Sequence, residues 1–303
     1  MTIGERLEQA GTDQPLSALI GACEAAAGQF RLPFNRQSWR GQTGNWAGAG
    51  IGSSIDFQDH RPYVPGDDPR YINWQAYARS GHYTMKLYRE EVRPQVDLVL
   101  DLSESMFVEP AKATRALELF YFACHSAWRN AALLNVTLVR GGELLRPQPE
   151  SLRVGDWPLP GDNAAPARTA SAPDWPRIPW STQSMRVVVS DFLYEQDPGE
   201  AMNLLARNGS QVVLYCVYAR SEMRPAWLGD VELLDCENGK RVRRHFTRQD
   251  IEDYHARYEG HFTGWADAAT RTRAAFVRVP DAGTLAEQLL ATAGPQGGVE
   301  LCN

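Results

Sequence analysis

Short, nearly continuous apolar runs alternate with amphipathic stretches over the last two thirds of the chain. Such runs are typical of strands buried on both faces of a sheet. The stretches between them repeat their apolar residues at helical spacing, as Leu117, Phe120, Cys124 and Trp128 do. This alternation predicts an α/β fold with a doubly wound, mainly parallel sheet. The expected strands are 96–101, 135–140, 185–191, 211–218 and 274–279, and the expected helices are 111–131, 198–208, 248–272 and 282–292.

The first third of the chain differs in its composition and in its apolar pattern. Residues 1–30 are expected to be helical, whereas 31–94 combine Gly, Trp, Tyr and Arg with few apolar runs. Residues 83–88 alternate as a strand does, so this part is predicted to be an irregular, partly β N-terminal subdomain. The Pro-rich segment 146–184 is expected to be a long loop with a short element. The predicted division is a subdomain at 1–94, an α/β domain at 95–293 and a tail at 294–303.

Composition and charge exclude several classes of function. The net charge is −6, which argues against non-specific nucleic-acid binding because that needs a dominant basic surface. The five cysteines are scattered, without CxxC spacing, which favours reduced thiols over disulfides or a zinc site. The N-terminus is too polar for a signal peptide, and no apolar run is long enough for a transmembrane helix. We therefore expect a cytoplasmic protein without direct membrane insertion.

Candidate metal ligands follow two of the predicted strands. Asp101 ends the first strand and is followed at once by Ser103 and Ser105, and Asp191 ends another strand. In open α/β sheets, ligands bind outside the carboxyl ends of the strands. Carboxylates and hydroxyls select hard cations, so Mg²⁺ is expected, with Mn²⁺ or Ca²⁺ as alternatives. Because serine hydroxyls are neutral ligands, the ion would remain electrophilic enough to accept a carboxylate from a partner.

Three other interpretations of these residues remain open. In the first, Asp101 forms a strand-end turn and Ser103 caps a helix, without any metal. In the second, Asp101 is the nucleophile of a haloacid-dehalogenase-type phosphotransferase, but that chemistry needs an aspartate two residues later, where Ser103 stands. In the third, Asp101 and Asp191 serve a metal-dependent hydrolase or phosphotransferase. We favour a non-enzymatic function, because no nucleophile–base pair and no histidine ligand spacing can be singled out.

The motif hhhhDxSxSM (h, apolar), with a later hhhSD, resembles the von Willebrand factor A-type fold and its metal-ion-dependent adhesion site. The preceding segment is more specific and resembles the bacterial family called domain of unknown function 58. The resemblance is strong over about 45–110 and looser to about 290. The residues that carry it are Ile55-Asp56-Phe57, Arg61-Pro62-Tyr63-Val64-Pro65-Gly66-Asp67-Asp68-Pro69-Arg70, Ile72-Asn73-Trp74, Ala78-Arg79 and Lys86.

This resemblance implies partners rather than a reaction. Family members are commonly encoded beside MoxR-type AAA+ ATPases and are thought to act with them in chaperone-like maturation or assembly of client proteins. The implied metal-site residues are Asp101, Ser103, Ser105 and Asp191. For the adhesion-site threonine in a middle loop, the sequence offers Thr169, which we favour, and Thr182.

The sequence departs from the family pattern at two places. Asn73 stands where the family usually has aspartate before Trp74, which puts any role of that carboxylate's charge in doubt. The usual Asp-Pro-x-Glu after a later strand is replaced by 218–222, Tyr-Ala-Arg-Ser-Glu. If the polar residues of 55–93 bind no ligand, we expect them to form ion pairs that hold the aromatic-rich subdomain together, with Asp67 or Asp68 as the acidic partner.

Overall fold

The chain forms two compact units that are described separately. A computed structural model describes residues 1–12, 14–34, 55–90, 93–161, 172–237 and 239–302. The larger unit, called the α/β unit, comprises residues 1–34 and 94–303, and the smaller one comprises residues 35–93.

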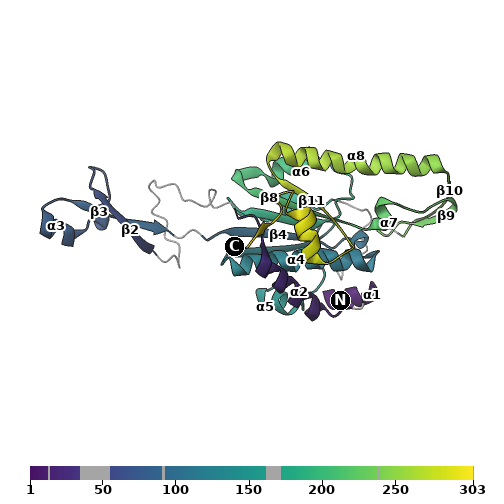
Figure 1. Ribbon diagram of the computed structural model, residues 1–303, viewed down its shortest axis with the longest axis horizontal. Helices are drawn as coiled ribbons and strands as arrows, with labels where there is room; N and C mark the ends of the chain where they lie inside the picture. Colours follow the sequence, from purple (N-terminus) through teal and green to yellow (C-terminus); the bar gives the residue numbers. More distant parts are fainter. Residues whose placement is uncertain (13, 35–54, 91–92, 162–171, 238, 303) are drawn as a thin grey trace. The chain divides into compact units, whose positions relative to one another are not determined.

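A six-stranded mixed sheet lies at the centre of the α/β unit (Figure 1). Five of its strands are parallel to one another, and the short β6 at one edge is antiparallel to its neighbour. Three of the strands, at 95–101, 185–190 and 211–218, are almost wholly buried, which explains their mainly apolar sequence. In spatial order the strands are β11 (Ala275–Pro280), β8 (Gln211–Tyr218), β7 (Met185–Ser190), β4 (Gln95–Asp101), β5 (Leu133–Arg140) and β6 (Glu143–Leu145).

Helices cover both faces of this sheet (Figure 1). The long α4 packs on one face, and the N-terminal helices pack on its outer side, whereas α6 and α8 cover the other face. No helix among the described residues has both the length and the apolar character needed to cross a bilayer. The helices of the unit are α1 (Ile3–Gln9), α2 (Leu16–Gln29), α4 (Pro110–Arg129), α5 (Pro149–Val154), α6 (Pro198–Leu205), α7 (Arg220–Met223), α8 (Arg248–Thr272) and α9 (Leu285–Gln288).

The two ends of the chain belong to the α/β unit, so the expected division at 1–94 and 294–303 needs correction. Helix α2 packs along α4 and buries Leu19 and Cys23 there. Directly after it, β1 (Phe30–Arg31) pairs with β12 (Glu300–Leu301). The C-terminal residues are therefore part of the fold rather than a tail, and the smaller unit starts only after Phe34.

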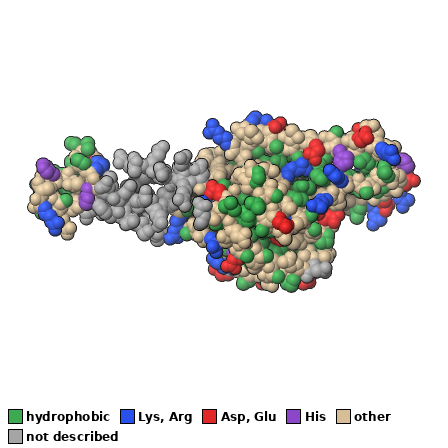
Figure 2. Space-filling model, viewed as in Figure 1, with side chains coloured by type: hydrophobic (Ala, Val, Ile, Leu, Met, Phe, Trp, Pro, Cys, Tyr) green, Lys and Arg blue, Asp and Glu red, His purple; other side chains and the backbone are tan. Residues whose placement is uncertain are grey.

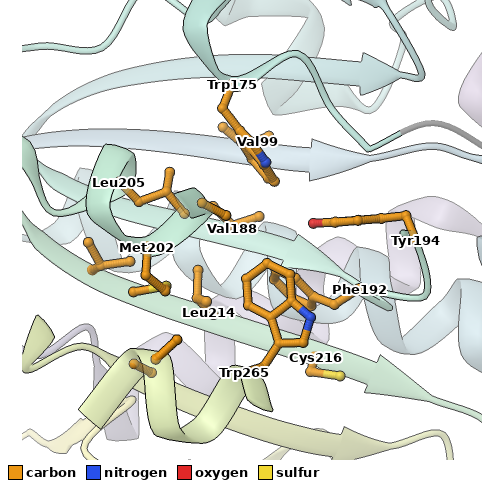
Figure 3. Packing of buried hydrophobic residues seen from close by; sticks show 14 of the residues in the cluster. Val99, Trp175, Val188, Phe192, Tyr194, Met202, Leu205, Leu214, Cys216 and Trp265 are labelled. Carbon is orange, nitrogen blue, oxygen red and sulfur yellow. The ribbon is translucent and has the colours of Figure 1, made fainter. Parts of the chain in front are cut away.

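The main core lies between the sheet and the layer formed by α6 and α8 (Figure 3). Val99, Val188 and Leu214 contribute to this core from three adjacent strands, as Trp265 does from α8, and all four side chains are almost completely buried. Because side chains alternate across a strand, the residues between them face α4 on the opposite side. A sheet buried in this way holds the carboxyl ends of its strands in fixed positions.

All five predicted strands are present and parallel, so the expected mainly parallel α/β fold is confirmed at this level. The predicted helix 248–272 coincides with α8. The predicted helix 1–30 is two helices, because Gly11 has a φ of +82° and Pro15 caps the second. The C-terminal helix is shorter than expected and continues as a π turn over Leu289–Ala293.

Sheet elements beyond the five predicted strands also belong to the α/β unit. One is β6, and another is an antiparallel hairpin of β9 (Gly229–Leu234) and β10 (Arg241–Phe246) that projects beyond α7 (Figure 1). Most side chains of this hairpin are exposed or half-buried, so it lacks the apolar pattern that marks the central strands.

The smaller unit pairs β2 (Ile55–Pro62) with β3 (Thr84–Glu90) in antiparallel fashion, and α3 (Trp74–Ser80) lies between them in the sequence. Its acidic turn is held by ion pairs, as the sequence suggested. Asp67 accepts two hydrogen bonds of 2.7 Å from Arg61, and Asp68 pairs with Arg70. The Arg61 guanidinium lowers the pKa of Asp67 to about 2.

Candidate functional site

The candidate site lies where the order of the strands reverses. Strand β4 has β5, which follows it in the chain, on one side and β7 on the other. Asp101 is the last residue of β4, and Asp191 directly follows β7. The carboxyl ends of adjacent parallel strands around such a reversal form the usual ligand crevice of open α/β sheets. We call Asp101, Ser103, Ser105 and Asp191 the carboxyl-edge site.

Asp101 is buried, and its side chain connects the two strands. Its Oδ1 accepts the Ser103 backbone N–H at 2.9 Å, and its Oδ2 accepts the Ser190 hydroxyl of β7 at 2.7 Å. Burial and the nearby charge of Asp191 raise the pKa of Asp101 from 3.8 to about 6, although both serines oppose this shift. Both hydrogen-bond donors to Asp101 among the described residues are neutral, so neither of them neutralises its ionised form.

The two serines of the motif lie side by side. The hydroxyl oxygens of Ser103 and Ser105 are 3.1 Å apart, at the start of a 3₁₀ turn over Glu104–Phe107. Neighbouring oxygen ligands of an octahedral ion with bonds of about 2.1 Å are separated by about 3.0 Å. The hydroxyl pair thus has the spacing of two adjacent ligands of a magnesium ion.

The loop that carries Asp191 is held in an unusual conformation. Phe192 has a φ of +55°, which is uncommon for a residue with a side chain. Its ring is fully buried and packs against Trp265 with ring centroids 4.9 Å apart (Figure 3). The resulting turn lets Asp191 Oδ1 accept the Leu193 N–H at 3.0 Å, and the Phe192 N–H donates to the Ser190 hydroxyl. Asp191 is therefore positioned by the core rather than by a free loop.

An internal cation lies next to Asp191. Lys112, in the first turn of α4, is completely buried and donates hydrogen bonds to Asp191 Oδ2 at 2.8 Å and to Glu222 Oε1 at 2.6 Å. Burial alone would lower the pKa of Lys112, but the two carboxylates raise it above its usual value. Burial likewise favours a higher pKa for Asp191, yet Lys112 keeps that pKa below its ordinary value. Lys112 and Asp191 are thus both charged.

A carboxylate also approaches the site from the β9–β10 hairpin. Glu237, at the hairpin tip, accepts the Ser105 backbone N–H at 3.0 Å through Oε1. Its pKa is raised by burial and by the charges of Glu104 and Asp191, against the lowering effect of Ser105. The hairpin therefore brings a half-buried carboxyl group to the edge of the site.

The donor set of the carboxyl-edge site fits a hard divalent cation. Ser103 interacts with Asp101 and Ser105 with Asp191, and each carboxylate oxygen keeps a lone pair beyond the hydrogen bond that it accepts. Lys112 forms ion pairs with Asp191 and Glu222, and the charge of Asp191 also acts on Asp101 and Glu237. No three His, Cys, Asp or Glu side chains in the described ranges form a metal cage by themselves. Any ion here would thus depend on the serine hydroxyls.

The two threonines considered for the adhesion site have different outcomes. Thr169 lies outside the residues that the structure describes. Thr182 is exposed and precedes the amino end of β7, whereas the site lies at the carboxyl end of the same strand. Six strand residues span about 20 Å, so Thr182 is too far away to share an ion with Ser103.

Sequence reasoning missed the groups that surround the four motif residues. Ser190, Lys112, Glu222 and Glu237 meet the site only through folding, and none of them belongs to the DxSxS spacing. Glu222 lies in the segment that departs from the family's Asp-Pro-x-Glu, and that segment nevertheless supplies a glutamate to the site. A lysine in the first turn of the helix that follows the motif was the available signal for Lys112.

Asn73 has a structural role within the smaller unit. Its side-chain oxygen caps α3 by accepting the Ala76 N–H at 3.1 Å, and its amide group lies 2.6 Å from the His60 ring. An N-cap needs only an acceptor oxygen, which asparagine supplies as well as aspartate does. The lost negative charge therefore leaves this cap intact.

Fold and site together define an α/β protein with an oxygen-rich site at the carboxyl edge of a mainly parallel sheet. The chain belongs to the family described as "Protein of unknown function DUF58", whose sequence model matches residues 59–261. No curated protein matches the chain.

A search of solved structures finds similarity to a protein titled "Crystal structure of conserved hypothetical protein BatB from Bacteroides thetaiotaomicron". The match has 13% sequence identity and a TM-score of 0.35, and it covers 64% of this chain and 94% of that one. A similarity this low contributes nothing to the assignment of the fold or the function.

Proposed function

We propose that this protein is a non-enzymatic adaptor of von Willebrand factor A type, which holds a divalent cation at the carboxyl-edge site and uses it to engage partner proteins. The observation that supports this proposal is the hydroxyl pair of Ser103 and Ser105, 3.1 Å apart, next to the buried carboxylates of Asp101 and Asp191. Mg²⁺ is the expected ion, with Mn²⁺ or Ca²⁺ as alternatives, because every candidate ligand is a hard oxygen.

The residues have distinct roles in this proposal. Ser103 and Ser105 would bind the ion as neutral ligands, and Asp101 and Asp191 would supply the negative charge that retains it. Thr169 is the proposed remaining ligand of this chain. A cation held mainly by neutral oxygens supplies an electrophilic position at which a carboxylate from another protein binds. Asp191 shares its charge with Lys112, which weakens its hold on the ion and favours an exchangeable site.

The proposed partners are a MoxR-type AAA+ ATPase and a client protein, in chaperone-like maturation or assembly. This part of the proposal follows from the family to which the chain belongs and from the motif residues, and it includes no catalytic step.

Calorimetric titration with Mg²⁺ and Mn²⁺ tests the metal site. We expect saturable binding to the wild type, and loss of at least tenfold in affinity for Ser103→Ala and Asp101→Ala. Ser17→Ala, which removes an exposed hydroxyl on α2, is the matched control and should bind as the wild type does. Equal affinity in all four proteins would refute the site.

A pull-down with a MoxR-type AAA+ ATPase tests the adaptor function. Binding should depend on Asp101 and should be lost with EDTA. A parallel screen for phosphatase and nuclease turnover with Mg²⁺ or Mn²⁺ addresses the hydrolase alternative. Turnover by the wild type that Asp101→Ala abolishes would replace the adaptor proposal with that one.

A further inference from the structure

The tip of the β9–β10 hairpin has a defined shape. The Asp235 N–H donates to the Lys240 carbonyl at 2.9 Å, and the Asp235 side chain accepts the Glu237 N–H at 2.9 Å. Gly239 has a φ of +71°, a conformation that glycine adopts without strain, and its N–H closes the turn on the Asp235 carbonyl. These hydrogen bonds therefore fix the backbone position of Glu237 at the tip.

Glu237 is the point at which this tip contacts the carboxyl-edge site. Its Oε1 accepts the Ser105 N–H, and its Oε2 accepts no hydrogen bond from the described residues. Nor does any described residue form an ion pair with it, although its carboxyl group is half-buried and feels the charge of Asp191. The neighbouring Glu104, in contrast, is paired with both Arg6 and Arg140. Glu237 is thus an acidic group at the edge of an acidic site, and the nearest cationic influence on it, from Arg140, falls short of an ion pair.

The hairpin is attached mainly at its base. There Phe246 is buried against Trp227, with ring centroids 5.8 Å apart, and Trp227 also contacts Tyr254 of α8. Along the strands the side chains are largely exposed, and charged groups such as Arg243 and Glu232 gather at this end of the unit (Figure 2). The base is thus held by apolar packing, whereas the tip is held to the site by the hydrogen bond from the Ser105 N–H.

We propose that Glu237 is an internal ligand of the carboxyl-edge site: its carboxylate occupies the position that an acidic side chain of a partner protein takes, and the partner must displace it. This inference rests on the proposed cation at the site. The Ser105 N–H and the cation together recognise one carboxylate, and Glu237 already uses the first of these two interactions. The partner is accordingly a protein that presents an exposed Asp or Glu, and its affinity is set by competition with the hairpin.

The variant Glu237→Gln tests this inference, because the amide oxygen can still accept the Ser105 N–H but lacks the charge that binds a cation. Glu232→Gln is the matched control: it removes a carboxylate of the same hairpin that pairs with Arg241 and Arg243 instead. Each protein is saturated with Mn²⁺, and the water-proton relaxation of the complex reports how many waters reach the ion. Binding of an acetylated, amidated Gly-Glu-Gly peptide is then measured, with Gly-Gln-Gly as the neutral probe.

For Glu237→Gln we expect faster water relaxation, about tenfold weaker Mn²⁺ binding and at least about tenfold tighter binding of the acidic peptide, since ligands and their supporting groups typically contribute 10–100-fold. Glu232→Gln should match the wild type, and the neutral peptide should not bind. Equal relaxation and equal peptide binding in all three proteins, with Mn²⁺ bound to each, would overturn this inference alone. A wild type that binds no Mn²⁺ would overturn both the inference and the proposed function.

Discussion

Replacement of Lys112 by methionine is the sharpest test of how the carboxyl-edge site is held together. The ammonium group is completely buried and neutralises two carboxylates, Asp191 at 2.8 Å and Glu222 at 2.6 Å. Methionine keeps most of the aliphatic stem within α4 and removes only the charge and its hydrogen bonds. The variant therefore leaves two carboxylates facing one another beside Asp101.

The expected cost follows from the burial of these partners. Loss of one member of a buried ion pair costs about 3–5 kcal/mol, because the remaining charge is uncompensated. The Glu222 side chain is 23% exposed and can reach water, whereas that of Asp191 is only 3% exposed and cannot. Asp191 therefore accounts for most of the loss. Asp191→Asn alone should cost about 1–3 kcal/mol, because Lys112 keeps Glu222 as a partner.

The pH dependence of Lys112→Met has a definite sign. In the wild type, Lys112 lowers the pKa of Asp191, so this pair stabilises the fold above the ordinary pKa of an aspartate and loses that effect as the pH falls. In the variant, burial raises the pKa of Asp191 instead, so its protonation relieves the charge. The destabilisation by Lys112→Met should therefore be larger at pH 8 than at pH 5.

Urea denaturation followed by tryptophan fluorescence measures these free energies of unfolding. Trp157, Trp175 and Trp265 are all buried in the α/β unit and report its unfolding. A double-mutant cycle with Lys112→Met and Asp191→Asn should show that the double variant costs at least about 1 kcal/mol less than the two single costs added together. Additivity within about 0.5 kcal/mol, with no difference between pH 5 and pH 8, would refute the reasoning.

Three further predictions follow from single side chains. Asp101→Asn should stabilise the metal-free protein at pH 8 by up to about 3 kcal/mol in thermal melts. The reason is that the pKa of Asp101, about 6, makes its ionised form costly, so the wild type loses stability as the pH rises from about 4 to 6. The same variant should lose any Mg²⁺-induced stabilisation. Asp97→Asn should cost about 2–3 kcal/mol in urea without changing Mg²⁺ affinity, because this buried carboxylate accepts four hydrogen bonds, two of them from Ser181, at the amino end of β4. Gly298→Ala should cost about 1–3 kcal/mol in the same assay, because the added methyl group would lie 2.6 Å from Val277 Cγ2.

The central sheet could be predicted from sequence because its signal is local. A buried parallel strand such as 211–218 consists almost wholly of apolar residues. The β9–β10 hairpin has no such signal, since its strands are largely exposed and it is held by Phe246 at its base. The Asn238-Gly239 pair between its strands was the available sequence indication of a hairpin.

The candidate site likewise combines residues with a local sequence signal and residues that lack one. Asp101 and Asp191 could be placed at one edge, because each directly follows a predicted strand and parallel strands end together. Lys112, Glu222 and Glu237 could not, because each comes from a different element and meets the site only when α4, α7 and the hairpin pack. The electrostatic state of the site depends on these three residues, so it was beyond prediction from spacing.

The two charged groups that flank the carboxyl-edge site differ in how easily they can leave it. Lys112 is completely buried in α4, and its displacement would leave the buried carboxylate of Asp191 without its partner, so its departure from the site is costly. Glu237 is half-buried, makes one hydrogen bond to the site and lies at the end of a largely exposed hairpin. If the site holds a cation as proposed, we therefore expect ligands to exchange on the hairpin side, with the hairpin controlling access of a partner's carboxylate to the site.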